Sequence, residues 1–136
     1  MKLYLAGRYG RRKELLGYAN TLKEQGHTIT SRWLNGEHEY ADSNSTEEQE
    51  RSWAKDDLDD IDSCDMLIAF TECGGKSASG ASRGGRHVEL GYALGMLKEV
   101  IVCGEAENIF CNTPITDALF KDFAALVESG YLQRHW

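Results

Sequence analysis

The chain has 136 residues, of which 41% are hydrophobic and 27% charged, and its formal net charge is −7 at pH 7. This length predicts one domain, residues 1–136, whose core needs neither a metal nor disulfides. The acidic balance argues against a nucleic-acid polymer as partner, because a phosphate backbone would be repelled. No apolar run approaches membrane-spanning length and no signal-peptide pattern precedes Lys2, so we expect a cytoplasmic protein that makes no membrane contact.

Apolar runs predict strands, and apolar residues at helical spacing predict helices between them. In chain order we expect a strand over Lys2–Ala6, a helix over 14–25, a strand over 27–30, a long loop over 32–46, a helix from Ser45 or Thr46 to about Ser63, a strand over Met66–Phe70, a helix opened by 84–93, a strand over Glu99–Cys103, a short edge strand over 115–119 and a helix over 122–129.

This alternation predicts parallel βαβ units, and therefore an α/β three-layer sandwich around a parallel sheet of four to five strands. Right-handed crossovers with the usual winding place the first and third strands side by side. The loops that follow these two strands, residues 7–13 and 71–85, then meet in one crevice. Open α/β sheets bind small molecules at such carboxyl ends of their strands.

The four cysteines do not predict a metal site. No two of them form a C-x-x-C pair, and no histidine spacing completes a zinc set. Cys64 and Cys103 flank or lie in apolar segments, which favours buried and unreactive thiols. We therefore expect no metal.

Glu89 is the first candidate for chemistry. It lies in the first turns of the helix opened by 84–93, and its neighbours at helical spacing include a single charged residue, Arg86. The helix dipole favours the ionised acid. A carboxylate held beside a glycine-lined hole suits a nucleophile for sugar chemistry. The alternative is a structural acid that pairs with Arg86 or caps the helix.

Asp57 and Tyr4 are the other candidates for chemistry. Among the acids of its helix, Asp57 is the best placed on the apolar face, in line with Trp53 and Ile61. A carboxyl there tends to have a perturbed pKa, which suits proton donation or base recognition; a cap or an ion pair with Arg51 is the alternative. Tyr4 lies close to the carboxyl end of the first strand, where its hydroxyl could orient a carboxylate rather than merely pack.

Cations and glycines gather around the two loops that we expect to meet. Glycine-lined loops let backbone N–H groups approach an anion, and neither loop has the spacing of a dinucleotide fingerprint or a Walker loop. We therefore predict that a mononucleotide phosphate binds here, although solvated loop arginines are the alternative. The predicted substrate-binding residues are Gly7, Arg8, Arg83, Gly85 and Arg86.

Three pieces of the sequence resemble the nucleoside 2-deoxyribosyltransferase-like family, which includes the deoxynucleoside 5′-monophosphate N-glycosidases. The pieces are YLAG at 4–7, DL at 57–58 followed by CDMLI at 64–68, and GGRHVELGYA at 84–93. Their order and spacing both agree with the family, and the resemblance spans roughly residues 2–104. It implies a flavodoxin-like parallel sheet.

The resemblance also implies an activity. It implies cleavage of the N-glycosidic bond of a 2′-deoxynucleoside or its 5′-monophosphate, with Glu89 attacking C1′ to form a glycosyl-enzyme intermediate that passes to water or to a second nucleobase. Tyr4 would hydrogen-bond the nucleophile, and Asp57 would contact or protonate the departing base. No metal or organic cofactor is implied, and a homo-oligomer of two or more subunits is. The chain departs from the family at Arg83, where transferases carry an acid, and a cation there favours a phosphate.

Two other functions stay open at the level of the sequence. The same nucleophile could serve an NAD or ribonucleotide glycohydrolase. Alternatively, a nucleotide-sensing module could bind in the crevice without turnover, although Glu89 and Asp57 on cleft-facing sides argue against it.

Overall fold

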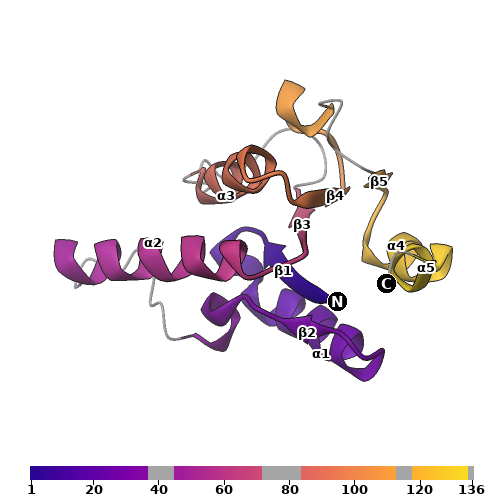
Figure 1. Cartoon of the computed structure of the whole chain (residues 1–136), viewed down its shortest axis with the longest axis horizontal. Helices are drawn as coiled ribbons and strands as arrows, with labels where there is room; N and C mark the ends of the chain where they lie inside the picture. Colours follow the sequence, from indigo (N-terminus) through magenta and orange to yellow (C-terminus); the bar gives the residue numbers. More distant parts are fainter. Residues whose placement is uncertain (37–44, 72–83, 113–117, 135–136) are drawn as a thin grey trace.

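A computed structural model of the chain describes residues 1–36, 45–71, 84–112 and 118–134 (Figure 1). Its centre is a five-stranded, all-parallel sheet in the order β2-β1-β3-β4-β5. The first and third strands are therefore neighbours, as predicted. The strands are β1 (Lys2–Ala6), β2 (Thr28–Ile29), β3 (Met66–Phe70), β4 (Glu99–Cys103) and β5 (Ala118–Phe120).

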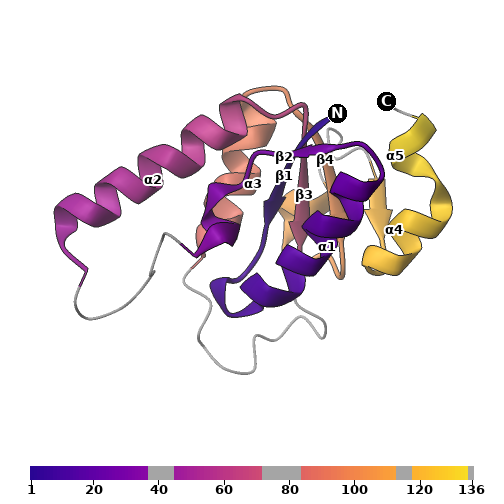
Figure 2. The same cartoon turned by 90° about the horizontal axis from the view of Figure 1, so that it is seen from below.

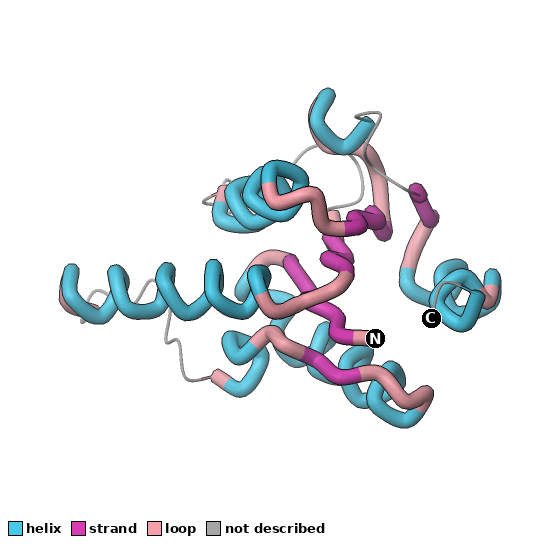
Figure 3. Tube along the Cα trace, viewed as in Figure 1, coloured by secondary structure: helices cyan, strands magenta, loops and turns pink. Residues whose placement is uncertain are grey.

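Helices cover both faces of the sheet, which confirms the predicted α/β sandwich. Helices α2 and α3 lie on one face, and α1, α4 and α5 lie on the other (Figures 2 and 3). No helix in the described part of the chain is long and apolar enough to cross a bilayer. The helices are α1 (Arg12–Glu24), α2 (Glu47–Asp62), α3 (Gly85–Gly95), α4 (Phe123–Ser129) and α5 (Tyr131–Arg134), and the 3₁₀ turns are η1 (Tyr9–Arg11), η2 (Arg32–Asn35) and η3 (Ile109–Asn112).

The core lies along the three central strands. All five residues of β3 are buried, as are the last four residues of β1 and of β4. A parallel sheet covered on both faces needs such continuous apolar strands, because neither face meets water. Cys64 and Cys103 are buried free thiols within this core, as predicted.

The strand that pairs with the outer edge of β1 is shorter than predicted. Strand β2 has two residues rather than four, and beyond it one main-chain bond and then two side-chain bonds continue the pairing with β1. The amide of Thr30 donates to the carbonyl of Leu3 at 2.9 Å. Beyond that, Ser31 Oγ accepts from the Leu5 amide at 2.6 Å, and Trp33 Nε1 donates to the Leu5 carbonyl at 2.9 Å. The segment predicted as loop over 32–46 therefore begins with an ordered turn, η2, that closes the edge of the sheet.

Other boundaries shift by a few residues. Helix α1 begins at Arg12, two residues before the expected start. Helix α2 begins after Thr46, whose side chain accepts from the Gln49 amide at 3.1 Å in a capping box. Strand β5 begins at Ala118, and residues 115–117 of the expected edge strand lie outside the described residues. Helix α5 was not predicted.

We expect Ser31→Ala to lower the free energy of unfolding by about 1–3 kcal/mol, because the Leu5 amide would lose its acceptor inside the protein. Ser31 is 4% exposed. Urea unfolding measures the change, with Ser52→Ala, exposed on α2, as the matched control. Equal stability of the two variants would contradict the role given to Ser31.

Candidate active site

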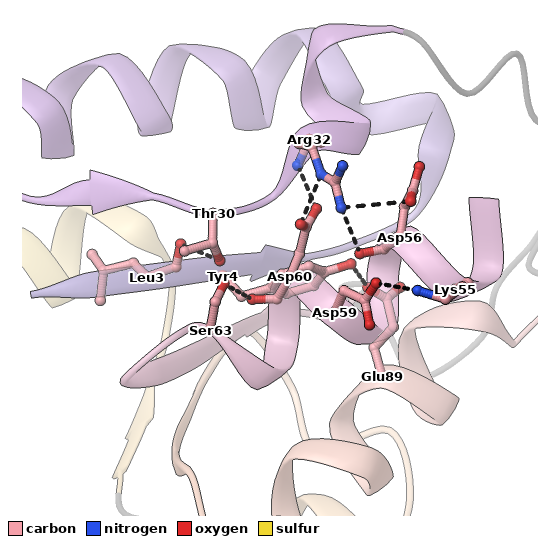
Figure 4. Close-up of polar contacts among 10 residues, drawn as sticks. All are labelled: Leu3, Tyr4, Thr30, Arg32, Lys55, Asp56, Asp59, Asp60, Ser63 and Glu89. Atoms are coloured by element: carbon pink, nitrogen blue, oxygen red, sulfur yellow. Dashed lines mark hydrogen bonds and ion pairs between the residues drawn. The ribbon is translucent and has the colours of Figure 1, made fainter. Parts of the chain in front are cut away.

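A side-chain hydrogen bond joins strand β1 to helix α3. Tyr4 of β1 is fully buried, and its hydroxyl donates to Oε2 of Glu89 on α3 (Figure 4). Gly84 precedes α3 with a φ of +79°, a conformation that L-residues rarely adopt. This turn starts the helix so that Glu89, five residues later, faces β1. The structure therefore brings together two residues that are 85 positions apart in sequence.

The environment of Glu89 favours its protonated form. Burial raises the pKa of the Glu89 carboxyl from its ordinary value of 4.5 to about 8. The hydrogen bond from Tyr4 opposes this shift, because the hydroxyl stabilises the ionised acid, and the charge of Asp57 adds to the shift. Glu89 is thus a carboxyl whose charge depends on the two other residues that the sequence singled out.

Asp57 lies on α2, partly buried on the same side of the sheet. Burial is the main cause that raises its pKa from 3.8 to about 7, and the charges of Asp60 and Asp56 add to it, while Arg32 opposes it. Once ionised, Asp57 hinders the ionisation of Glu89, because its negative charge raises the pKa of that carboxyl. The pKa of the Tyr4 hydroxyl is held well above its usual value by burial, by Glu89 and by Asp57.

Asp60 joins this group, and the sequence analysis missed it. Its carboxylate accepts from the Arg32 amide at 3.0 Å and from Arg32 Nε at 2.8 Å, and the residue is 6% exposed. The signal was available, because Asp60 follows Asp57 by three positions and so shares its side of the helix. The partner was not visible, since Arg32 stood in a segment with no predicted structure.

Arg86, a predicted substrate-binding residue, has a protein partner. Its guanidinium forms a two-pronged ion pair with Glu107, including a 3.1 Å bond from Nε to Oε1. The side chains of Arg86 and Glu107 are 5% and 11% exposed. Sequence reasoning gave Glu107 no role. The pair fastens the segment after β4 to the start of α3.

The other four predicted substrate-binding residues differ in their surroundings. Gly7 has a packing reason, since a Cβ there would lie 2.7 Å from Leu15 Cδ2. Gly85 is exposed. Apart from its chain neighbours and the backbone of its own helix, no described atom would lie within 4 Å of a Cβ at this position. Arg83 lies outside the described residues. Arg8 is half-buried, with its guanidinium folded beside Gly10.

Arg11 ties the two predicted loops together. Its guanidinium forms bonds of 2.9 and 2.7 Å with the two carboxylate oxygens of Glu14, and Nη1 donates to the carbonyl of Thr71 at 3.1 Å. These bonds are the main cause that lowers the pKa of Glu14 to about 2. Thr71 follows β3, so the turn after β1 and the carboxyl end of β3 are held side by side, as the crossover rule predicted.

No group of three metal-ligating side chains is arranged around a common point within residues 1–36, 45–71, 84–112 and 118–134. A small pocket between α1 and η2 is lined by Leu16, Ala19, Lys23, Ile29, Ser31, Arg32, Leu34 and Asn35. It contains none of Tyr4, Asp57 and Glu89.

Solved structures of other proteins share this fold, and two of them align over most of this chain. The 2-deoxyribosyltransferase of the psychrotolerant bacterium Bacillus psychrosaccharolyticus aligns with a TM-score of 0.70 and 23% identity, over 93% of this chain and 90% of that one. The CMP N-glycosidase BcmB of Clostridium botulinum aligns with a TM-score of 0.60 and 20% identity, over 97% of this chain and 99% of that one. No family model and no curated protein matches the sequence. The likeness confirms the predicted flavodoxin-like fold, and both proteins carry names of the kind that the sequence resemblance implied.

We expect Glu89→Gln to stabilise the protein in alkali. The pKa of Glu89 is about 8 in the folded protein and near its ordinary 4.5 when unfolded, so the folded state keeps a proton that the unfolded state has lost. The stability from this proton is complete below about pH 4.5 and is lost as the pH rises through 8. The neutral variant avoids that loss, so its advantage should be on the order of 1–4 kcal/mol at pH 9.

Chemical unfolding of both proteins at pH 5 and pH 9 measures this difference. The advantage of Glu89→Gln should shrink toward pH 5, where the native carboxyl keeps its proton. Glu24→Gln, exposed at the end of α1, is the surface control. A difference that does not change with pH would contradict the raised pKa.

Proposed function

We propose that this protein cleaves the N-glycosidic bond of a 2′-deoxynucleoside or a 2′-deoxynucleoside 5′-monophosphate, with Glu89 as nucleophile. The observation that carries the proposal is the partly buried carboxyl of Glu89, which accepts a hydrogen bond from Tyr4 and whose pKa is raised by loss of water and by the charge of Asp57. Two interacting carboxyls with raised pKa values are the equipment of a glycosidic-bond enzyme. The fold shared with a deoxyribosyltransferase and a CMP N-glycosidase supports the same class.

In the proposed reaction, the ionised Glu89 attacks C1′ and the bond from C1′ to the base nitrogen breaks. The bonding pair leaves with the base, which takes a proton from Asp57. The resulting glycosyl ester on Glu89 is then attacked at C1′ by water or by a nitrogen of a second nucleobase, and in either case the attacking group gives its proton to Asp57. Two inversions at C1′ give overall retention, and the carboxylate of Glu89 is regenerated.

The chemistry needs the proton on Asp57 and the negative charge on Glu89. Both carboxyls keep their protons to higher pH than ordinary carboxyls, with pKa values of about 7 and about 8, so the pair ionises in two coupled steps, and its singly ionised state includes the reactive arrangement. The Tyr4 hydroxyl favours this arrangement, because its hydrogen bond stabilises the ionised carboxylate of Glu89. Tyr4 is therefore assigned the task of readying the nucleophile.

Several finer points of the proposal rest on the sequence. A 5′-phosphate would bind near Gly7, Arg8 and Gly85, with Arg83 and Arg86 as further cations. The ion pair of Arg86 with Glu107 means that a phosphate would have to compete with a carboxylate for this guanidinium. A homo-oligomer in the cytoplasm is also proposed. Exposed apolar side chains support an assembly: Val88, Ile109 and Phe110 are 67%, 77% and 61% exposed.

We expect free base to be released from a deoxynucleoside or its 5′-monophosphate by the native chain, and Glu89→Ala to abolish release while the protein stays folded. Chromatography of a panel of deoxynucleosides, monophosphates, ribonucleotides and NAD, each with and without a second base, measures this. Glu24→Ala, exposed on α1, is the matched control.

The outcomes of this panel separate the possible functions. Release from monophosphates alone, unaffected by a second base, identifies a nucleotide hydrolase. A new nucleoside in the presence of the second base identifies a transferase. Cleavage of NAD or ribonucleotides alone would replace the proposed substrate. Strong thermal stabilisation by nucleotides without any free base would favour a sensing module, and substantial activity in a folded Glu89→Ala protein would exclude Glu89 as the nucleophile.

We expect the activity lost in Tyr4→Phe to be greatest at low pH. Without the hydroxyl the pKa of Glu89 rises, so less of it is ionised in acid, and kcat/KM at pH 6 should fall roughly 10–100-fold, the range expected for a lost hydrogen bond to a charged group. The loss should shrink above pH 9, where Glu89 is ionised in both proteins. Tyr18→Phe is the matched control, because the Tyr18 hydroxyl donates to Glu14 at 2.6 Å on the other face of the sheet. An equal loss at every pH would contradict the role of Tyr4.

A further inference from the structure

Arg32 holds helix α2 at two points one turn apart. Its main-chain amide and its Nε donate to the two carboxylate oxygens of Asp60 at 3.0 and 2.8 Å. Its Nη2 donates to the carbonyl of Asp56 at 3.4 Å and lies 3.6 Å from the carboxylate of the same residue (Figure 4). The η2 turn is thereby fastened to the stretch of helix that carries Asp57.

Of the two partners, Asp60 is the one that loses most of its contact with water. The Asp60 side chain is 8% exposed, whereas that of Arg32 is 47% exposed. A buried carboxylate without a partner is strongly unfavourable, so the guanidinium both neutralises Asp60 and fixes where it sits. The fork geometry, with an amide and Nε reaching two oxygens of one carboxylate, also fixes the rotation of the helix at this turn.

The opposite side of α2 is fixed as well. The Tyr92 hydroxyl donates to Asp62 at 2.8 Å, and Lys98 Nζ donates to the carbonyls of Asp62 and Cys64 at 2.7 and 2.9 Å. These contacts, from Tyr92 of α3 and from Lys98 between α3 and β4, secure the last turn of α2. The first turns of α2 extend away from the sheet (Figures 1 and 2). The turn with Asp57 therefore lies between an anchored end and a projecting one.

We propose that Arg32 is a positioning residue for Asp57: it holds the α2 turn between Asp56 and Asp60 in register with Tyr4 and Glu89, and its charge offsets the carboxylates beside Asp57. The catalytic part of this inference rests on the proposed function. The contacts to Asp56 and Asp60 flank Asp57 on the same helix, so any rotation of that turn moves the Asp57 carboxyl relative to Glu89.

The charge of Arg32 acts on the pKa of Asp57, so its removal should change the pH dependence of activity, which a simple loss of structure would not do. The groups that act on Asp57 are Asp56 and Asp60 of its own helix and Arg32 of η2, and Asp57 in turn acts on Tyr4 of β1 and Glu89 of α3. Arg32 lowers the pKa of Asp57, so without its charge Asp57 would keep its proton to higher pH. Because the reaction uses the protonated form, the loss of activity caused by a displaced Asp57 should be full at low pH, where Asp57 is protonated in both proteins. It should be partly offset at high pH, where more of Asp57 keeps its proton in the variant.

The experiment compares Arg32→Gln, Arg32→Lys and Lys55→Gln with the native chain. Lys55 forms a 2.7 Å ion pair with Asp59 on the same helix, with both side chains well exposed, and so is the matched control. Base release gives kcat and KM from pH 5 to pH 10. Carbon NMR of the Asp57 carboxyl follows its titration in the same proteins without any substrate.

We expect Arg32→Gln to lower kcat at pH 6 roughly 10-fold or more with little change in KM, as for a displaced catalytic group. Its activity relative to the native chain should recover toward pH 9, and the Asp57 titration should move upward by about 0.5–1 pH unit. Arg32→Lys keeps the charge but not the fork, so its activity should be lowered equally at every pH. Lys55→Gln should match the native chain.

Other results would overturn the proposal. An Arg32→Gln protein with native kcat and an unshifted Asp57 titration would do so, as would a Lys55→Gln protein with the same defects. Should Arg32→Gln not fold, Arg32→Lys decides, because native kcat in that variant contradicts positioning. A shifted Asp57 titration in a protein whose native form releases no base would uphold the electrostatic role of Arg32 while the proposed function fails.

Discussion

Several carboxyl groups share a small, largely buried space around the Tyr4 hydroxyl, and the rest of the structure has to make that arrangement tolerable. Glu89 approaches from α3, while Asp57 and Asp60 approach from α2. Loss of water favours the protonated forms of Glu89 and Asp57, and neighbouring carboxylate charges add to this effect. Two devices offset this cost: Arg32 neutralises Asp60, and the Tyr4 hydroxyl solvates Glu89. The remaining imbalance appears as raised pKa values on Glu89 and Asp57.

The parallel sheet supplies the rigidity that such an arrangement needs. Strand β1 is paired with β3 along four residues, and its other edge is closed by side chains of the segment after β2. Tyr4 therefore has no freedom to retreat from Glu89. Helices α2 and α3 contact each other beside it, which lets one face of the sheet carry every acid of the group. A raised free energy in the folded state is a common cost of a working site, and removal of the charge is expected to stabilise the fold.

Two of the arginines near the carboxyl ends of the strands, Arg11 and Arg86, hold parts of the chain together. Arg11 joins the turn after β1 to the end of β3, and Arg86 joins the start of α3 to the segment after β4. Both act as fasteners at the carboxyl ends of the strands, each with a carboxylate partner. These contacts hold the segments after β1 and β4 in place near the candidate site. A phosphate bound as proposed would have to compete with Glu14 or Glu107 for these groups.

Local sequence patterns were sufficient to predict the alternation of strands and helices, the adjacency of β1 and β3, and the candidates Tyr4, Asp57 and Glu89, because periodicity and crossover handedness act over short stretches of chain. The boundaries of β2 and the η2 turn were not predictable, since Ser31 and Trp33 pair with β1 through side chains rather than through a regular ladder. The partnerships of Arg32 with Asp60 and of Arg86 with Glu107 were equally invisible. Each joins segments more than 20 residues apart, and such pairings depend on how the layers pack, which no local pattern encodes.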